Sequence, residues 1–206
     1  MKSVAYAAVA ACLLSACASW TPPPFQGGEP LRLSPAEAAG ATVRSIHVTA
    51  EPDVVDKVAS SRDADYRRTS QTGEPNSQAV MMAEMSLSND VGAEIHNELR
   101  RCATGARPLN AVVRLDDLRW DERLSSLADA KGFDALQGEV ELVDPALGNA
   151  VVGRYRIEVA TNSGGLLTRI LSDRTETLAE EFGRALCMEA FGRNPRGPAI
   201  ENSTRG

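Results

Sequence analysis

The residues best suited to chemistry are three closely spaced aspartates, Asp116, Asp117 and Asp121. Carboxylates at this spacing could hold Ca²⁺ or act as a general acid and base. A short acidic run at the end of a strand is also typical of a solvated surface. Two interpretations follow, an envelope hydrolase with an unrecognised acidic site or a charged surface without catalysis, and we favour the second.

Other catalytic signals are missing from the sequence. The two histidines, His47 and His96, form no His-x-x-x-His pair, and there is no Cys-x-x-Cys pair. There is also no Gly-x-Ser-x-Gly elbow, phosphate-binding Gly-Lys-Ser/Thr loop or Gly-x-Gly-x-x-Gly turn. We therefore expect no catalytic residues, no metal site and no cofactor, and we predict that the protein is not an enzyme.

The first residues have the plan of a secretory leader. Lys2 supplies a positive start, and the apolar run Val4–Leu14 is too short to span a bilayer. The run ends in Leu14-Ser15-Ala16-Cys17, which resembles the lipobox of bacterial lipoproteins. The resemblance implies that residues 1–16 are removed and that Cys17 becomes an acylated N-terminus. An ordinary signal peptide with a cysteine near its cleavage site is the alternative.

Acylation at Cys17 would make the membrane the first partner of this chain. Two or more acyl chains anchor a protein stably, whereas a single chain binds only marginally. The residue after the cysteine is Ala18 and not Asp. By the sorting pattern of lipoproteins, this resemblance implies the periplasmic face of the outer membrane in a two-membrane bacterium.

The remaining cysteines suggest a disulfide bond. Cys12 leaves with the leader and Cys17 takes lipid, so Cys102 and Cys187 remain together in an oxidising compartment. One bridge between them is the expectation, and two separate thiols are the alternative. An argument against the bridge is that an ideal helix places Cys187 away from the apolar face of its own helix.

Composition limits the class of protein. The chain has 206 residues, of which 43% are hydrophobic and 24% charged, so one globular domain with flexible ends is expected. The net charge is −6, and about −7 once Lys2 is removed with the leader. Binding to nucleic acid requires a basic surface, so we exclude a nucleic-acid partner.

Both ends of the mature chain are predicted to lie outside the domain. Residues 17–40 form a Pro/Gly-rich tether, which could reach about 70 Å if fully extended. Trp20 and Phe25 either rest in the lipid interface or touch the domain. Residues 193–206 are predicted to be a flexible tail.

Residues 41–192 are predicted to form one periplasmic domain. A strand over 41–49 precedes a short helix over 54–60, a mobile loop and a long helix over 78–102. Strands follow over 111–120, 135–143 and 151–159, with a polar excursion over 121–131 and a final helix over 173–191. The last two strands alternate apolar and charged residues and should form an antiparallel hairpin.

This order predicts an α+β fold, a two-layer sandwich with a mainly antiparallel sheet of about four strands and two helices on one face. The element order is similar to that of small periplasmic domains in curli-secretion lipoproteins, lipoprotein activators of peptidoglycan synthases and auxiliary lipoproteins of ABC transporters. That resemblance covers about residues 41–191 and transfers no function.

The predicted function is a lipid-anchored, non-enzymatic protein-interaction module in an envelope assembly for secretion, transport or cell-wall synthesis. Its partner is expected to be another envelope protein, contacted by the sheet face, an edge strand or the loop over 53–77. Met81, Met82 and Met85 either form a pliable contact surface or are ordinary residues, as core filler or as a partly exposed helix start. A small-ligand carrier is a further alternative, although 4% aromatic residues offer few stacking surfaces.

Overall fold

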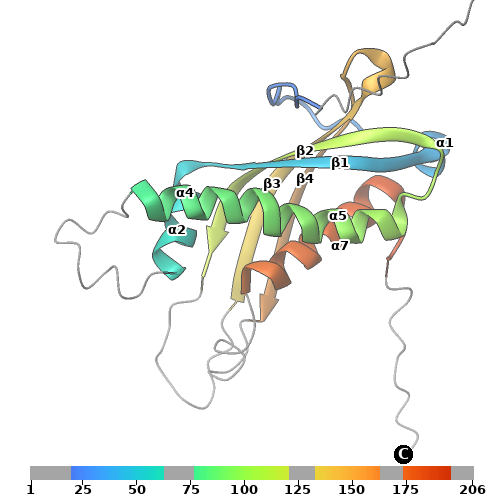
Figure 1. Ribbon diagram of the computed structural model, residues 1–206. Coiled ribbons are helices and arrows are strands. Elements are labelled where there is room, and N and C mark those ends of the chain that lie inside the picture. Colours follow the sequence, from blue (N-terminus) through green and yellow to red (C-terminus); the bar gives the residue numbers. More distant parts are fainter. Residues whose placement is uncertain (1–19, 63–76, 121–132, 163–173, 196–206) are drawn as a thin grey trace, which may run out of the picture.

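The computed structural model describes residues 20–62, 77–120, 133–162 and 174–195 (Figure 1). Four strands in these ranges form a single sheet in the order β1-β2-β3-β4. They are β1 (Ala41–Ala50), β2 (Arg107–Arg119), β3 (Phe133–Asp144) and β4 (Ala150–Asn162). β1 is parallel to β2 and the other neighbours are antiparallel, so the predicted α+β class with a mainly antiparallel sheet is confirmed.

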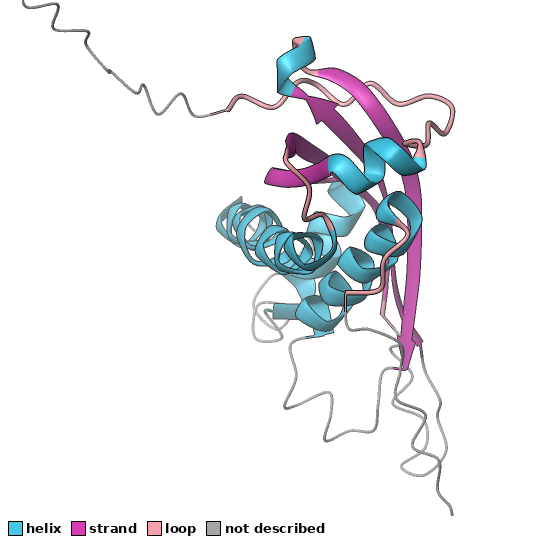
Figure 2. Cartoon of the chain, turned by 90° about the vertical axis from the view of Figure 1, so that its right-hand side faces the viewer, coloured by secondary structure: helices cyan, strands magenta, loops and turns pink. Residues whose placement is uncertain are grey.

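The helices pack on one face of this sheet (Figures 1 and 2). The predicted long helix consists of α4 (Ser77–Ser86), a π-helical turn η1 (Leu87–Val91) and α5 (Gly92–Cys102). α7 (Arg174–Phe191) lies beside α5, and α2 (Pro52–Arg62) follows β1. The hydrophobic core lies between these helices and the sheet, as expected for two layers.

The π-helical turn has a cause in the sequence. The buried residues Ala83, Leu87, Val91, Ile95 and Leu99 recur every four positions. An α-helix has 3.6 residues per turn, so each step of four rotates the stripe about 40° too far. The wider turn at Leu87–Val91 takes up part of this excess, and the stripe stays buried from one end to the other.

The predicted antiparallel hairpin of β3 and β4 is present, with a register shift between Leu142 and Val143. Glu139 lies opposite Arg156 and Glu141 opposite Arg154 on the face without helices. The turn between the strands contains the 3-10 helix η2 (Pro145–Leu147), followed by Gly148 at φ 68°. The charged pairs lie opposite each other because alternate side chains of a strand point to the same face.

A helix that was not predicted from the sequence precedes β1. α1 (Pro35–Gly40) begins with a capping box, in which the Ser34 hydroxyl accepts from the backbone N–H of Glu37 and the Glu37 carboxylate accepts from the backbone N–H of Ser34. Proline follows the cap at the first helical position. Both are known start signals for a helix, so this element was open to prediction.

The C-terminal helix ends where predicted. Gly192 has φ 63°, and its N–H donates to the carbonyl of Met188 over 3.1 Å. The next residue, Arg193, belongs to the predicted tail but is attached to the domain, because its guanidinium donates to the Cys102 carbonyl over 3.0 Å.

The predictions for the leader, for Cys17, for 63–76, for 121–132 and for 196–206 lie outside the described residues.

Candidate functional site

The disulfide predicted between Cys102 and Cys187 is present. Their Cα atoms are 5.9 Å apart, and 85 residues separate them in sequence. Both side chains are buried. The argument that Cys187 lies away from the buried face of its helix is wrong, because α7 is buried on two sides: Leu178 and Phe182 belong to the core, and Cys187 faces α5.

A glycine allows the two helices to approach this closely. A Cβ atom at Gly183 would lie 2.9 Å from the Cβ of Glu98 and 3.1 Å from the Cα of Ile95. Cys187 and Cys102 come one turn after Gly183 and Glu98, so the close contact of the backbones brings the two sulfur atoms together. The bridge therefore fixes the end of a parallel helix pair, and its role is structural.

The acidic cluster is engaged in ion pairs. Asp116 is 3.0 Å from the Arg114 guanidinium, and Asp117 is 3.3 Å from the Lys57 ammonium and 2.9 Å from the Arg119 guanidinium. Asp121, the third member, lies outside the described residues. Within the described ranges, no group of three or more His, Cys, Asp or Glu side chains could hold a metal ion.

The histidines are not brought together. His47 lies in the edge strand β1, whereas His96 lies on α5 with its Nε2 3.3 Å from the carbonyl oxygen of Val43. The imidazole of His96 thus contacts a backbone group of β1. The hydrogen bond of the His96 ring is therefore to a backbone carbonyl group and not to a nucleophile or a carboxylate.

The segment from Trp20 to Leu33, which we call the strap, lies on the sheet face that carries no helices. The backbone N–H groups of Gln26 and Gly27 donate to Glu141 over 3.1 and 3.0 Å, and the Arg114 guanidinium lies 4.6 Å from the centre of the Phe25 ring. Glu141 is fully buried and also accepts from Arg154 over 3.0 Å. This part of the predicted tether is therefore bound to the domain.

The strap then leaves this face over the edge of β4. Leu31 exchanges two backbone hydrogen bonds with Arg154, of 3.1 and 2.7 Å. The N–H of Leu33 donates to the Tyr155 hydroxyl oxygen over 3.0 Å, and burial raises the pKa of that hydroxyl. The strap thus blocks the middle of an edge strand, which limits pairing with another chain at this edge.

The turn between β3 and β4 is held at its base by an ion pair between the buried Asp144 and the partly exposed Arg107. Asp144 accepts from the Arg107 guanidinium over 2.5 Å and from the backbone N–H of Ala146 over 2.8 Å. Burial raises the pKa of Asp144, but these hydrogen bonds outweigh burial and hold the pKa below its ordinary value. The side chain of Asn149, at the end of the turn, accepts from the Trp20 indole N–H over 3.3 Å.

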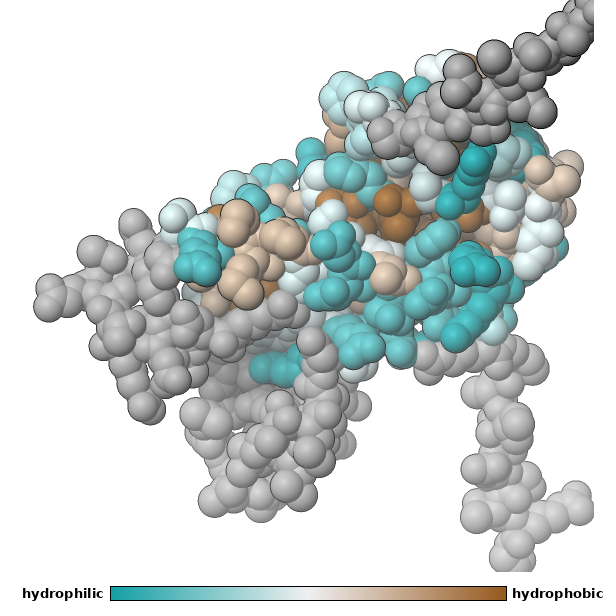
Figure 3. Space-filling model, in the orientation of Figure 1, coloured by the Kyte–Doolittle hydropathy of each residue, from teal (hydrophilic) through white to brown (hydrophobic). Residues whose placement is uncertain are grey.

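An apolar patch lies on α4. Met81, Met82 and Met85 are 53%, 59% and 56% exposed, so they do not fill the core. They are neighbours on the helix because positions three and four apart share a face. Figure 3 shows pale brown side chains gathered in this region of the surface. We call these three residues the methionine patch.

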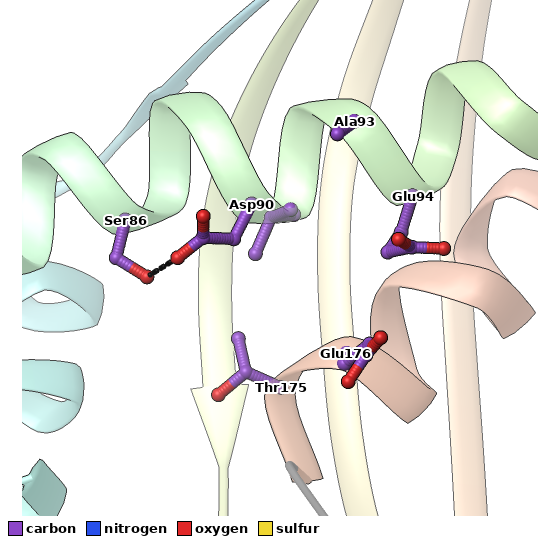
Figure 4. A pocket seen from close by; sticks show the side chains of 7 residues that line it. Ser86, Asp90, Ala93, Glu94, Thr175 and Glu176 are labelled. Carbon is purple, nitrogen blue, oxygen red and sulfur yellow. Dashed lines mark hydrogen bonds between the residues drawn. The ribbon is translucent and has the colours of Figure 1, made fainter.

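A pocket opens between η1, the start of α5 and the start of α7 (Figure 4). Its volume is about 290 Å³, and it is lined by Ser86, Asp90, Val91, Ala93, Glu94, Thr175 and Glu176. The Ser86 hydroxyl donates to Asp90 over 2.6 Å. None of these residues was predicted from the sequence to form a site. The one sequence signal for the π turn beside the pocket is the row of apolar residues that continues at intervals of four through Leu87 and Val91.

Comparison with known proteins adds little to these observations. No protein-family model matches the chain, and no curated protein matches it. Among solved structures, a single-residue variant of the PelC dodecamer from Paraburkholderia phytofirmans is similar at 12% identity and a TM-score of 0.37, over 80% of this chain and 96% of that one. A second PelC dodecamer structure from this organism gives 12% identity and a TM-score of 0.35, over 75% and 92% of the two chains.

A third solved structure, a candidate lipoprotein from Caulobacter crescentus, has 18% identity and a TM-score of 0.31, over 53% of this chain and 83% of that one. TM-scores this low assign neither a fold family nor a function. Within the described ranges, none of the helices combines the length and the apolar character needed to cross a bilayer.

Proposed function

We propose that this protein is a non-enzymatic lipoprotein, anchored through Cys17 at the periplasmic face of the outer membrane, whose domain binds another envelope protein. The observation that carries the binding role is the methionine patch, whose side chains are 53–59% exposed. In keeping with the predicted leader, the partner would belong to an envelope assembly for secretion, transport or cell-wall synthesis.

The methionine patch has the physical properties of a contact surface. Grouped apolar side chains at a surface gain free energy when a partner removes them from water. The unbranched thioether of methionine adapts to the shape of that partner. Glu84 is the one charged residue in α4, so few charges would have to be desolvated on binding.

The two alternatives have weaker support. A hydrolase would need a free acid or base, whereas Asp116 and Asp117 are both bound by cationic side chains. A small-ligand carrier would use the pocket beside η1, but its volume of about 290 Å³ is at the lower limit for ligand sites, and Asp90, Glu94 and Glu176 make its lining acidic.

Site-specific cross-linking in intact cells tests the binding role. A photoreactive amino acid in place of Met82 should give one dominant adduct, and the same residue in place of Glu158, on the open sheet face, should not. With the photoreactive residue kept at position 82, replacing Met81 and Met85 by glutamine should abolish the adduct with little loss of stability, because both side chains are exposed. An adduct from position 158 alone would move the interface to the sheet, and no adduct from either position would refute the binding role.

The anchor has its own test. Wild-type protein should incorporate a labelled fatty acid and sediment with outer membranes, whereas Cys17→Ser should do neither. Labelled wild-type protein in the inner membrane would overturn the location without affecting the acylation. Absence of label in the wild type would show that the leader is an ordinary signal peptide.

A further inference from the structure

The strap limits how far the domain can stand from its anchor. Trp20 is held by its indole hydrogen bond to Asn149, and the chain behind it is held at Glu141 by two backbone N–H groups. Cys17 is three residues before Trp20. Three residues span at most about 11 Å, instead of the roughly 70 Å that a free tether over 17–40 would allow.

The same contact identifies the end of the domain that this short connection draws to the lipid. Asn149 belongs to the β3–β4 turn, whose residues Pro145, Ala146, Leu147 and Gly148 are all exposed, Leu147 at 60%. Headgroups form a layer of about 5–8 Å on each side of the hydrocarbon core. A turn bound to Trp20 is then within reach of that layer.

The composition of this end fits a lipid surface. Residues 20–28 and 145–153 contain no Asp, Glu, Lys or Arg, although 24% of the whole chain is charged. At the base of the turn, Asp144 is buried and paired with Arg107, whose side chain is 34% exposed and also lies 4.0 Å from Glu37. Tryptophan and exposed apolar side chains without nearby charge are favoured in the interfacial region of a bilayer.

We propose that the β3–β4 turn and the Trp20 end of the strap form a membrane-contact surface that holds the domain against the lipid headgroups. This inference rests on the proposed anchor at Cys17, and it sets the orientation of the domain. α4, which carries the methionine patch, lies apart from this turn in Figure 1 and would remain available to a partner.

The test uses the mature full chain, purified with its lipid and reconstituted into vesicles whose lipids are brominated near the headgroup end of the acyl chains. Trp20 and Trp120 are retained, so that the indole hydrogen bond of Trp20 stays intact, and an additional tryptophan is introduced as Leu147→Trp or, as a control of nearly equal exposure, as Met82→Trp. The quenching of the added tryptophan is the difference from the parent protein in the same vesicles. Quenching of about twofold is expected at position 147 and almost none at position 82, because quenching by bromine is short-ranged.

A longer connection should weaken this contact without touching the fold. About ten Gly/Ser residues inserted between Cys17 and Trp20 add roughly 17 Å of mean reach, so quenching at position 147 should fall. Vesicle flotation of the same samples separates the two hypotheses. Protein that fails to float refutes the anchor, whereas protein that floats with equal quenching at 147 and 82, or with quenching unchanged by the insertion, refutes the membrane-contact surface.

Discussion

Substituting Gly183 by alanine should reveal how closely α5 and α7 must pack. The new Cβ would lie 2.9 Å from the Cβ of Glu98 and 3.1 Å from the Cα of Ile95, so backbone atoms would have to move. Overpacking of this kind costs about 1–3 kcal/mol. Gly92→Ala is the matched control, because a Cβ there would meet its nearest atom, Cγ2 of Val48, at an ordinary 3.4 Å.

The comparison cancels the intrinsic preference of alanine for helices. Both glycines lie within helices, and each replacement gains about 0.8–1 kcal/mol from propensity. Gly92→Ala should therefore raise the free energy of unfolding by about 1 kcal/mol. Gly183→Ala should lower it by up to about 2 kcal/mol, which leaves a difference of about 1–3 kcal/mol between the variants for the steric effect.

The assay is equilibrium unfolding in guanidinium chloride, followed by far-ultraviolet circular dichroism, with the Cys102–Cys187 bridge verified by mass after alkylation. Removing the bridge from both variants would let the helices separate, so the cost of Gly183→Ala should then shrink. If the two alanine variants are equally stabilised, the close contact of α5 with α7 does not exist in solution, and the approach of their backbones cannot be what brings the two cysteines together.

Two further predictions concern buried carboxylates. Glu141→Ala should lower the free energy of unfolding by about 3–5 kcal/mol, because it removes the ion-pair partner of the largely buried Arg154 and the acceptor for two backbone N–H groups of the strap. Glu158→Ala, with a side chain 60% exposed, should change it by less than about 1 kcal/mol, and equal losses in urea unfolding would contradict the role of the strap. For Asp144, the pKa in the fold lies below the unfolded value of about 3.9, so its stabilisation is complete above that pH and is lost as pH falls through the lower, folded pKa. Asp144→Asn should therefore be less stable than wild type at neutral pH, with a gap that closes in acid, and a gap independent of pH would contradict the lowered pKa.

The parts of the fold that were predictable are those with a local repeat. Alternation along β3 and β4, with a turn at Gly148 and Asn149, defines both the hairpin and its register, because a shift of one residue would exchange the buried and charged faces. The helix predicted over 78–102 was equally clear from its apolar stripe. Its π turn was missed because a spacing of four resembles ordinary helical periodicity, although over several turns it drifts away from 3.6.

The strap could not be predicted in the same way. A segment with three consecutive prolines has no apolar period, and its partner Glu141 lies 114–115 residues further along the chain. The alternation of charge in β3 places Glu141 on the open face, but it does not reveal that backbone N–H groups from the N-terminal segment will bury it. When a backbone group and a side chain far apart in the sequence form a hydrogen bond, the residues around neither partner show a pattern that predicts it.

The strap changes what the same residues imply about function. A free tether would let the domain move and rotate in the periplasm, so any of its surfaces could bind a partner. With Trp20 bound near the β3–β4 turn, part of the outer sheet face is covered. If Cys17 is acylated as proposed, this turn would be drawn toward the anchor. Partner binding would then be confined to what lies away from the membrane, where the methionine patch is an apolar surface. The lipid anchor and the strap would thus act together, because one sets the distance of the domain from the membrane and the other sets which side it presents.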